Sequence, residues 1–289
     1  MIGAKGQLGT ALCNVLQGSD VIPFTHEDLE ICNFDLVKQV LSKYKPNVIV
    51  NTAAYVQVNN CEIKQDKAFS VNAMGARNVA VVAHDIEAKL VHIGTDYVFG
   101  GDLDMGTIPY TEFNHPAPVN LYGKSKLAGE NLVRHLCSRY FIVRSSGLFG
   151  TSGASDKGGN FVETVLKIAK EKDELKVVND QVFSPTYARD LAKKIAQLIN
   201  TEYYGIFHIT NSGACSWYEF AKDIIKLAKL DIPIIPITSA QYPQEARRPC
   251  YSVLDNYHLR LLGMDAMRSW QEALCDYMKE KGYLKVDST

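Results

Sequence analysis

The chain has no excess of either charge and no long apolar run. Its 289 residues carry 31 basic and 32 acidic side chains, for a formal net charge of −1, and no basic stripe is present. This balance gives no electrostatic basis for binding nucleic acid or a membrane surface. No apolar segment approaches the roughly 18 residues that a membrane-spanning helix needs, and the glycine-broken N-terminal stretch is too polar for a signal peptide. We therefore expect a cytoplasmic protein with no nucleic-acid or membrane partner.

Cysteine and histidine occur, but not at the spacing of metal ligands. The seven cysteines are scattered without a Cys-x-x-Cys pair, and the seven histidines form no His-x-x-x-His pair. These patterns favour reduced thiols and predict no metal site. A hydrophobic content of 46% over this length is enough for one large core with a smaller annex, or for two modest domains.

Three glycines near the N-terminus have a spacing that is typical of a phosphate-binding turn. The stretch from Gly3 to Gly9 reads Gly-Ala-Lys-Gly-Gln-Leu-Gly and runs into a helix-like segment, residues 10–16. Such glycines allow a tight turn and a close approach of backbone to a pyrophosphate, while a helix N-terminus offers free N–H groups. Only two residues precede Gly3, so the strand expected before it is very short.

Short β-branched runs alternate with longer helical patterns, which predicts an α/β fold with a doubly wound parallel sheet. The expected strands are 21–24, 47–50, 90–93, 140–143, 175–178 and 205–209; the expected helices are 35–44, 66–84, 120–137, 160–172 and 185–199, the last with Ser184 as its N-cap. We expect residues 1–150 to form the nucleotide-binding domain, to which the chain returns around 175–210. Residues 151–289 would mainly form a smaller α+β substrate subdomain.

A tyrosine and a lysine stand four residues apart in the expected helix 120–137. Tyr122 and Lys126 therefore leave the same face of that helix. We expect the lysine cation to pull the Tyr122 pKa from about 10 toward neutral, where the phenol can act as a general acid. Thr95, which follows the expected strand 90–93, supplies a hydroxyl that can bind the carbonyl oxygen that Tyr122 protonates.

With the glycine turn, Thr95, Tyr122 and Lys126 in this order, the chain resembles the extended short-chain dehydrogenase/reductase superfamily. Stretches along nearly the whole chain are similar to the dTDP-4-dehydrorhamnose reductase family, namely 51–58, 71–78, 92–100, 159–162, 180–181, 184–187 and 248–249. The resemblance implies an NAD(P)-binding Rossmann fold. It also implies that NADPH or NADH reduces the 4-keto group of dTDP-4-dehydro-6-deoxy-L-mannose to give dTDP-L-rhamnose for polysaccharide biosynthesis. A homodimer is a candidate assembly.

The resemblance further implies roles for single residues. Tyr122 would be the general acid, Lys126 its pKa-lowering partner and a ligand of the nicotinamide ribose, and Thr95 the hydroxyl that orients the ketone. Cofactor contacts would come from Gly3, Gly6, Gln7, Leu8, Glu30, Ile31, Ala53, Ala54, Tyr55, Tyr122 and Lys126, and substrate contacts from Thr95, Asp96, Gly147, Asn160 and Arg248.

Three positions depart from the family pattern. Gly147 stands where many relatives carry a tryptophan against the sugar, Phe183 replaces a common glycine, and Asn59 replaces a frequent aspartate. Without that tryptophan, the sugar pocket should be larger or should hold another aromatic, for which Phe183 and Tyr97 are the sequence candidates. We expect this protein to accept a wider range of 4-keto sugar nucleotides as substrates than the tryptophan-bearing relatives do.

The expected second strand ends in Phe24-Thr25-His26, without the acidic residue that would bind a free 2′-hydroxyl and repel a 2′-phosphate. NADPH should therefore be accepted at least as well as NADH.

Two other functions use similar motifs. A sugar-nucleotide dehydratase would need an acidic residue after Thr-Asp, where this chain has Tyr97, and an epimerase shares the fold. A cofactor-binding regulatory subunit, like the β subunit of methionine adenosyltransferase, would need a partner enzyme.

Overall fold

A four-stranded parallel sheet forms the centre of the computed structural model, which describes residues 1–101, 107–152 and 159–284. Its order is β1–β2–β3–β8, with β1 Val48–Asn51, β2 Lys89–Ile93, β3 Tyr140–Arg144 and β8 Gly205–His208. Ile2 adds a single parallel bridge to Asn51 on one side and to Phe24 on the other. Because the chain starts inside the sheet and extends it in both directions, the fold is doubly wound, as predicted.

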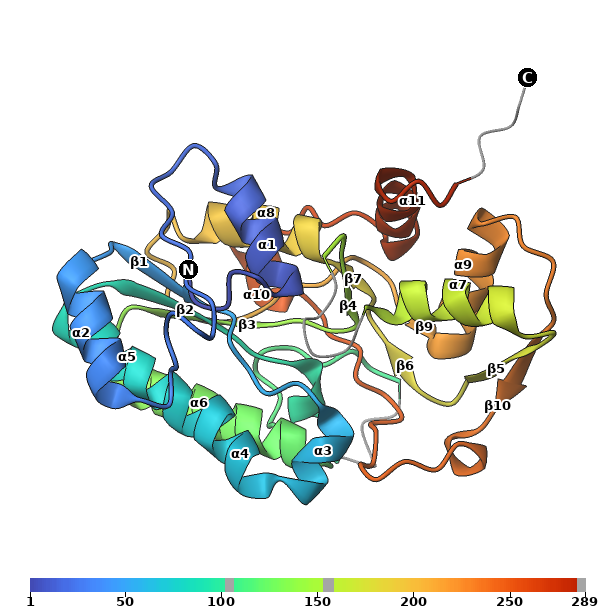
Figure 1. The fold of residues 1–289 in the computed structure, drawn as a ribbon, viewed down its shortest axis with the longest axis horizontal. Helices are drawn as coiled ribbons and strands as arrows, with labels where there is room; N and C mark the ends of the chain where they lie inside the picture. The colour runs from blue at the N-terminus through green and yellow to red at the C-terminus, as the bar shows by residue number, and fades with distance from the viewer. Residues whose placement is uncertain (102–106, 153–158, 285–289) are drawn as a thin grey trace.

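Helices cover both faces of this sheet (Figure 1). One face carries α1 Gln7–Val15, α8 Ala188–Leu198 and α10 Tyr257–Leu261; the other carries α2 Phe34–Tyr44, α5 Ala76–Asp85 and α6 Leu121–Leu136. Successive strand residues point to opposite faces. Ile49 and Leu90 therefore pack under α2 and α5, whereas Val50 and Val91 pack under α1 and α8. The buried strands thus read as continuous apolar runs.

The predicted helix 66–84 is divided into three elements. They are α4 Gln65–Phe69, a π-helical turn at Ser70–Gly75 and α5, and they follow the short helix α3 Val58–Ile63. The π-turn carries Asn72, whose amide accepts from Tyr55 N (2.7 Å) and donates to Ser125 Oγ (2.9 Å). An added Cβ on Gly129 of α6 would overlap the Asn72 carbonyl oxygen, so this glycine permits the close approach of α6. Sequence periodicity alone does not reveal such a turn.

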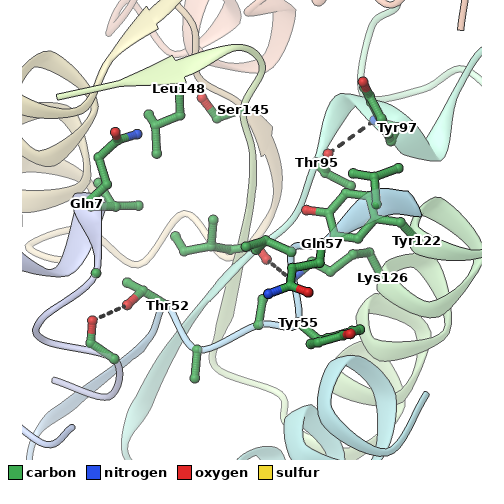
Figure 2. A pocket seen from close by; sticks show the side chains of 18 of the residues that line it. Gln7, Thr52, Tyr55, Gln57, Thr95, Tyr97, Tyr122, Lys126, Ser145 and Leu148 are labelled. Atoms are coloured by element: carbon green, nitrogen blue, oxygen red, sulfur yellow. Dashed lines mark hydrogen bonds between the residues drawn. The ribbon is translucent and has the colours of Figure 1, made fainter. Parts of the chain in front are cut away.

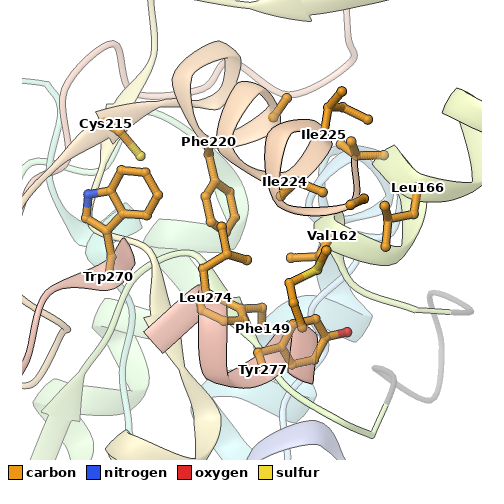
Figure 3. Close-up of a cluster of buried hydrophobic side chains, with 14 of the residues drawn as sticks. Phe149, Val162, Leu166, Cys215, Phe220, Ile224, Ile225, Trp270, Leu274 and Tyr277 are labelled. Atoms are coloured by element: carbon orange, nitrogen blue, oxygen red, sulfur yellow. The ribbon is translucent and has the colours of Figure 1, made fainter. Parts of the chain in front are cut away.

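A second hydrophobic core lies beside the sheet, under α7 Phe161–Glu171, α9 Trp217–Leu227 and α11 Trp270–Glu280. Figure 3 shows Phe149, Phe220, Leu274 and Tyr277 meeting in it. Three two-stranded sheets accompany these helices: β5 Leu175–Val178 with β10 Ile234–Ile237, β4 Leu148–Phe149 with β7 Thr186–Tyr187, and β6 Val182–Phe183 with β9 Cys215–Ser216. Short 3-10 turns occur at Asp96–Val98 and Ser239–Gln241.

Three sequence predictions about elements are wrong. Residues 21–24 form no strand, and Phe24 contributes only the single bridge to Ile2. The strand at 175–178 exists, but it pairs with β10 instead of joining the main sheet. Helix α8 begins at Ala188, because the residues before it extend to pair β7 with β4, so Ser184 is not its N-cap. The other predicted strands, and the helices 35–44, 120–137 and 160–172, agree within about one residue at each end.

The proposed division near residue 150 stays a prediction. Helix α8 and strand β8 pack with the main sheet, while α7, α9 and α11 share the second core. Within residues 1–101, 107–152 and 159–284, none of the helices has the length and apolar character that crossing a membrane demands.

Candidate active site

A cavity of about 920 Å³ opens at the carboxyl ends of the parallel strands and reaches the second core. Its walls come from the turn after Ile2, from the segments that follow β1, β2 and β3, and from α6, β6 and α9. This position is where ligands bind in open α/β sheets, and the volume suits a small molecule or cofactor.

The glycine turn forms one wall of this cavity. Gly3 has φ +79°, and an added Cβ would lie 2.6 Å from Thr52 Oγ1; one on Gly9 would overlap the Gly3 carbonyl oxygen. Gly6 is the N-cap of α1, so the first N–H groups of that helix lie at the turn. Gln7 Oε1, on the same helix, is buried and has no hydrogen-bond partner among the described residues. The closely packed turn and the helix N–H groups fit a pyrophosphate, while the unsatisfied Gln7 oxygen can accept a hydrogen bond from a hydroxyl or amide group of the same cofactor.

Tyr122, Lys126 and Thr95 meet on the opposite side of the cavity (Figure 2). Helix α6 is capped by Asn120, whose side chain accepts from Gly123 N (2.8 Å), and its first turns present Tyr122 and Lys126. The Thr95 hydroxyl lies near the Tyr122 phenol, donates to Asp96 Oδ1 and accepts from Tyr97 N, each at 3.2 Å. Lys126 Nζ donates to the Ile93 carbonyl oxygen (2.6 Å). The structure therefore brings together the three residues that the sequence analysis assigns to catalysis.

The expected pKa of Tyr122 is wrong for this structure. Burial raises the pKa of Tyr122 above its ordinary value, and the hydrogen bond with Thr95 opposes that rise only partly. Burial lowers the pKa of Lys126 to about 8, with Glu130 opposing the shift. The Lys126 ammonium is directed to the Ile93 carbonyl, and burial, together with the nearby Asp96 charge, sets the direction of the Tyr122 pKa shift. Tyr122 therefore remains protonated at neutral pH, as a proton donor requires.

Asp96 is buried in a cluster of hydroxyl groups. Its Oδ2 accepts from Ser146 Oγ and from Ser252 Oγ, each at 2.7 Å, and its backbone N–H donates to the Ser145 carbonyl (3.0 Å). Burial raises the Asp96 pKa to about 6, although these hydrogen bonds oppose the rise. Asp96 thus lines the cavity and also links the segment after β2 to the segment after β3.

The predicted cofactor-binding residues also line this cavity. They are Gly3, Gly6, Gln7, Leu8, Glu30, Ile31, Ala53, Ala54, Tyr55, Tyr122 and Lys126. Glu30 Oε2 contacts His26 Nδ1 (3.2 Å), and Glu30 Oε1 accepts from the N–H of Cys32 (3.0 Å). Lys5 and Thr25 stand at the same end of the cavity.

The predicted substrate-binding residues are not all brought together. Thr95, Asp96, Gly147 and Asn160 line the cavity, but Asn160 uses its amide to cap α7 and to donate to the Gly150 carbonyl (2.9 Å). Arg248 lines a separate hollow of about 300 Å³, where its guanidinium donates to Asn59 Oδ1 (2.9 Å).

Several residues that line the cavity were missing from the sequence analysis. Ser145 stands directly after β3, and its Oγ is buried without a hydrogen-bond partner in the described part of the chain. Because Ser145 directly follows a parallel strand, its sequence position could have indicated that it lines the cavity. Phe161 and Trp217 line the cavity beside the second core. Their alternation with other apolar helix residues gave no sign that they face a ligand.

The fold and the site define a class of protein. The doubly wound sheet, the glycine turn and the group of Thr95, Tyr122 and Lys126 are those of an NAD(P)-dependent oxidoreductase in the extended short-chain dehydrogenase/reductase class.

Comparison with known proteins identifies the family within this class. The family model described as RmlD substrate binding domain matches residues 1–282, and the chain belongs to this family. It is 42% identical to the spore coat polysaccharide biosynthesis protein SpsK of Bacillus subtilis, with 96% of each chain covered. It is 37% identical to the dTDP-4-dehydrorhamnose reductase of Aggregatibacter actinomycetemcomitans, with 94% of this chain and 95% of that one covered.

A solved structure shows the same similarity in three dimensions. The crystal structure of dTDP-4-dehydrorhamnose reductase from Bacillus anthracis in complex with NADP is 44% identical to this chain and superposes with a TM-score of 0.91. The superposition covers 96% of this chain and 97% of that one. The predicted family and fold class are confirmed.

Proposed function

We propose that the protein is an NAD(P)H-dependent reductase that converts dTDP-4-dehydro-6-deoxy-L-mannose to dTDP-L-rhamnose. The observation that carries this proposal is the meeting of Thr95, Tyr122 and Lys126 at a cavity whose other wall is a glycine turn. The activity named for relatives that match almost the whole chain supports the choice of substrate.

The side chains supply the proton and the positioning in this reaction. Bound NAD(P)H would supply the hydride. Thr95 donates a hydrogen bond to the C4 carbonyl oxygen and holds it beside the Tyr122 phenol. Tyr122, protonated because burial raises its pKa, gives its proton to the oxygen as negative charge develops there. Lys126 lies one helical turn away and offers a cation to the ribose and to the tyrosine after proton transfer.

The residues present fit NADPH as well as NADH. The segment ending at Phe24 is followed by Thr25, whose N–H and hydroxyl bind Asp28 at 2.8 and 2.7 Å. Asp28 does not line the cavity, whereas Lys5, His26, Glu27 and Glu30 do. The Lys5 ammonium can bind a 2′-phosphate and a glutamate can accept from a free 2′-hydroxyl, which supports both cofactors.

We further propose that the enzyme works in the cytoplasm, because its cysteines are scattered along the chain without a Cys-x-x-Cys pair, a pattern that favours reduced thiols. The homodimer stays a prediction, which light scattering of the purified protein tests.

The test is an assay of the full chain with NADPH and a dTDP-4-keto-6-deoxy sugar. We expect NADPH to be consumed only when the sugar nucleotide is present, with dTDP-L-rhamnose as the product identified by mass spectrometry. A protein that binds NADPH but consumes none would support the regulatory-subunit alternative. Release of an isomerised or dehydrated sugar nucleotide, without net NADPH consumption, would support the epimerase or dehydratase alternative.

A further inference from the structure

Gly147 and Phe183 are two of the departures from the family pattern, and the Phe183 ring fills the space that a side chain at 147 would need. A Cβ built on Gly147 would overlap Cδ2 and Cε2 of the Phe183 ring. Gly147 also has φ +50°, a backbone conformation that L side chains rarely adopt. Thr186 N donates to the Gly147 carbonyl (3.3 Å), which ties the segments that carry the two residues together. The position of the phenylalanine therefore requires glycine at 147.

Other aromatic side chains hold the Phe183 ring in place. It is 3% exposed and stacks on the Trp217 ring, with centroids 3.8 Å apart and an interplanar angle of 26°. Phe220 packs edge-on against Phe183 at 6.0 Å, and Phe161 packs against Trp217 at 4.6 Å. A ring supported in this way is preorganised, so little conformational entropy is lost when a ligand contacts it.

These aromatic side chains line the same cavity as the reacting groups. Phe183 and Trp217 line the cavity together with Gly147. Gly147 directly follows Ser146, whose hydroxyl binds Asp96, and Asp96 is the neighbour of Thr95. A sugar whose C4 carbonyl reaches Thr95 therefore extends toward the Phe183 ring. A 6-deoxyhexose offers a methyl group and ring C–H groups, which suit an aromatic surface.

We propose that Phe183, supported by Trp217, determines which 4-keto sugar the enzyme accepts. The aromatic wall of the sugar site is thus supplied from strand β6. This inference rests on the proposed function and names the residue that shapes its sugar site. Of the two alternatives expected beside Gly147, a larger pocket or another aromatic, the second fits this structure, because Phe183 fills the space. Tyr97, the other sequence candidate, packs on Tyr122 with ring centroids 5.8 Å apart.

The first experiment separates the sugar from the nucleotide. Binding of dTDP-L-rhamnose, dTDP and NADPH to the full chain is measured by calorimetry for the native protein and for Phe183→Leu, which keeps an apolar side chain but removes the aromatic face. We expect the affinity for dTDP-L-rhamnose to fall about tenfold and those for dTDP and NADPH to change by less than about twofold. Phe113→Leu, which alters a ring that is 70% exposed and outside the cavity, is the control.

The second experiment exchanges the two residues. Gly147→Trp and Phe183→Gly should each weaken dTDP-L-rhamnose binding about tenfold, and Gly147→Trp should also lower the Tm because the two rings overlap. The double variant should recover binding to within about threefold of the native protein and regain only part of the Tm lost in Gly147→Trp, because the positive φ at 147 still strains a tryptophan after the ring overlap is removed.

Each outcome decides a separate claim. Native affinity of Phe183→Leu for dTDP-L-rhamnose, or an equal loss for dTDP, would overturn the role of Phe183 in sugar selection. A double variant with no better Tm than Gly147→Trp would overturn the shared space, and this readout needs no substrate. If the native protein neither binds nor forms dTDP-L-rhamnose, the proposed function fails, whatever the exchange series shows.

Discussion

At the scale of single residues, burial sets the protonation states that the chemistry uses. Tyr122 and Lys126 share one helix face, yet their pKa values shift in opposite directions. Burial destabilises the charged form of each group, which is the anion for tyrosine and the cation for lysine. The phenol is thus a neutral donor, and the lysine is close to its titration point at mildly alkaline pH.

Replacing Tyr122 by phenylalanine removes the proton donor and keeps the ring. We expect kcat to fall by roughly 10² to 10⁴ while NADPH still binds, because general acid catalysis contributes about this much. Steady-state kinetics and a fluorescence titration with NADPH measure the two effects. Tyr44→Phe, at an exposed position outside the cavity, should leave both unchanged. Near-native turnover of Tyr122→Phe would remove Tyr122 from the mechanism.

The raised pKa of Asp96 predicts a pH-dependent stability. The ordinary value for this carboxyl is 3.8 and the folded value is about 6, so between these values the folded state binds more protons than the unfolded state. The free energy of unfolding should therefore decrease as the pH rises from about 4 to about 6. Urea unfolding of the native protein and of Asp96→Asn across this pH range isolates the contribution of Asp96 titration to the free energy of unfolding. A parallel pH dependence in both proteins would contradict the prediction.

At the scale of elements, α6 depends on close packing of its backbone. Gly123 and Gly129 face backbone carbonyls of Tyr97 and Asn72, each of which an added Cβ would overlap. A buried ion pair, Arg144 with Glu130 at 2.7 Å, fixes the same helix to strand β3. The position of Tyr122 beside Thr95 follows from this packing.

Gly129→Ala should test the close approach of α6. Alanine favours a helix by about 1 kcal/mol over glycine, but here its methyl group would displace Asn72, so we expect a net loss of about 1–3 kcal/mol of stability. Lys124→Ala, at an exposed position on the same helix, should change the stability by less than about 0.5 kcal/mol. Thermal and urea unfolding provide the measurements. An increase in stability for Gly129→Ala would show that α6 has room at this point.

At the scale of the whole molecule, one cavity is lined by both hydrophobic units. Residues of the main sheet supply the glycine turn and the group around Tyr122, and residues near the second core supply Phe183 and Trp217. A ligand that fills the cavity contacts both units and should stabilise them together.

NADPH should therefore raise the stability of the full chain, by about 2.7 kcal/mol at a hundredfold excess over its Kd. The contact of Lys5 and His26 with the same end of the cavity predicts that kcat/KM with NADPH is at least equal to that with NADH. Thermal unfolding with each cofactor and initial rates with each cofactor provide the measurements. A kcat/KM for NADH well above that for NADPH would contradict the predicted preference.

The sequence by itself determined the features that depend on local pattern. Alternating apolar runs predicted β1, β2, β3 and the helices around them, because strand and helix periods are properties of short segments. The glycine turn, Thr95, Tyr122 and Lys126 were found from residue type and spacing, since strand ends in a parallel sheet meet at one edge.

Only the tertiary structure decided the features that depend on contacts between distant segments. In the folded chain β5 pairs with β10, and Arg248 lines a hollow separate from the main cavity. The Tyr122 pKa is raised and not lowered, because burial is a property of the folded chain. The tertiary structure also showed that Gly147 and Phe183, 36 positions apart (183 − 147), share one space. A sequence read position by position shows two unrelated departures, since steric overlap exists only between side chains that the fold brings together.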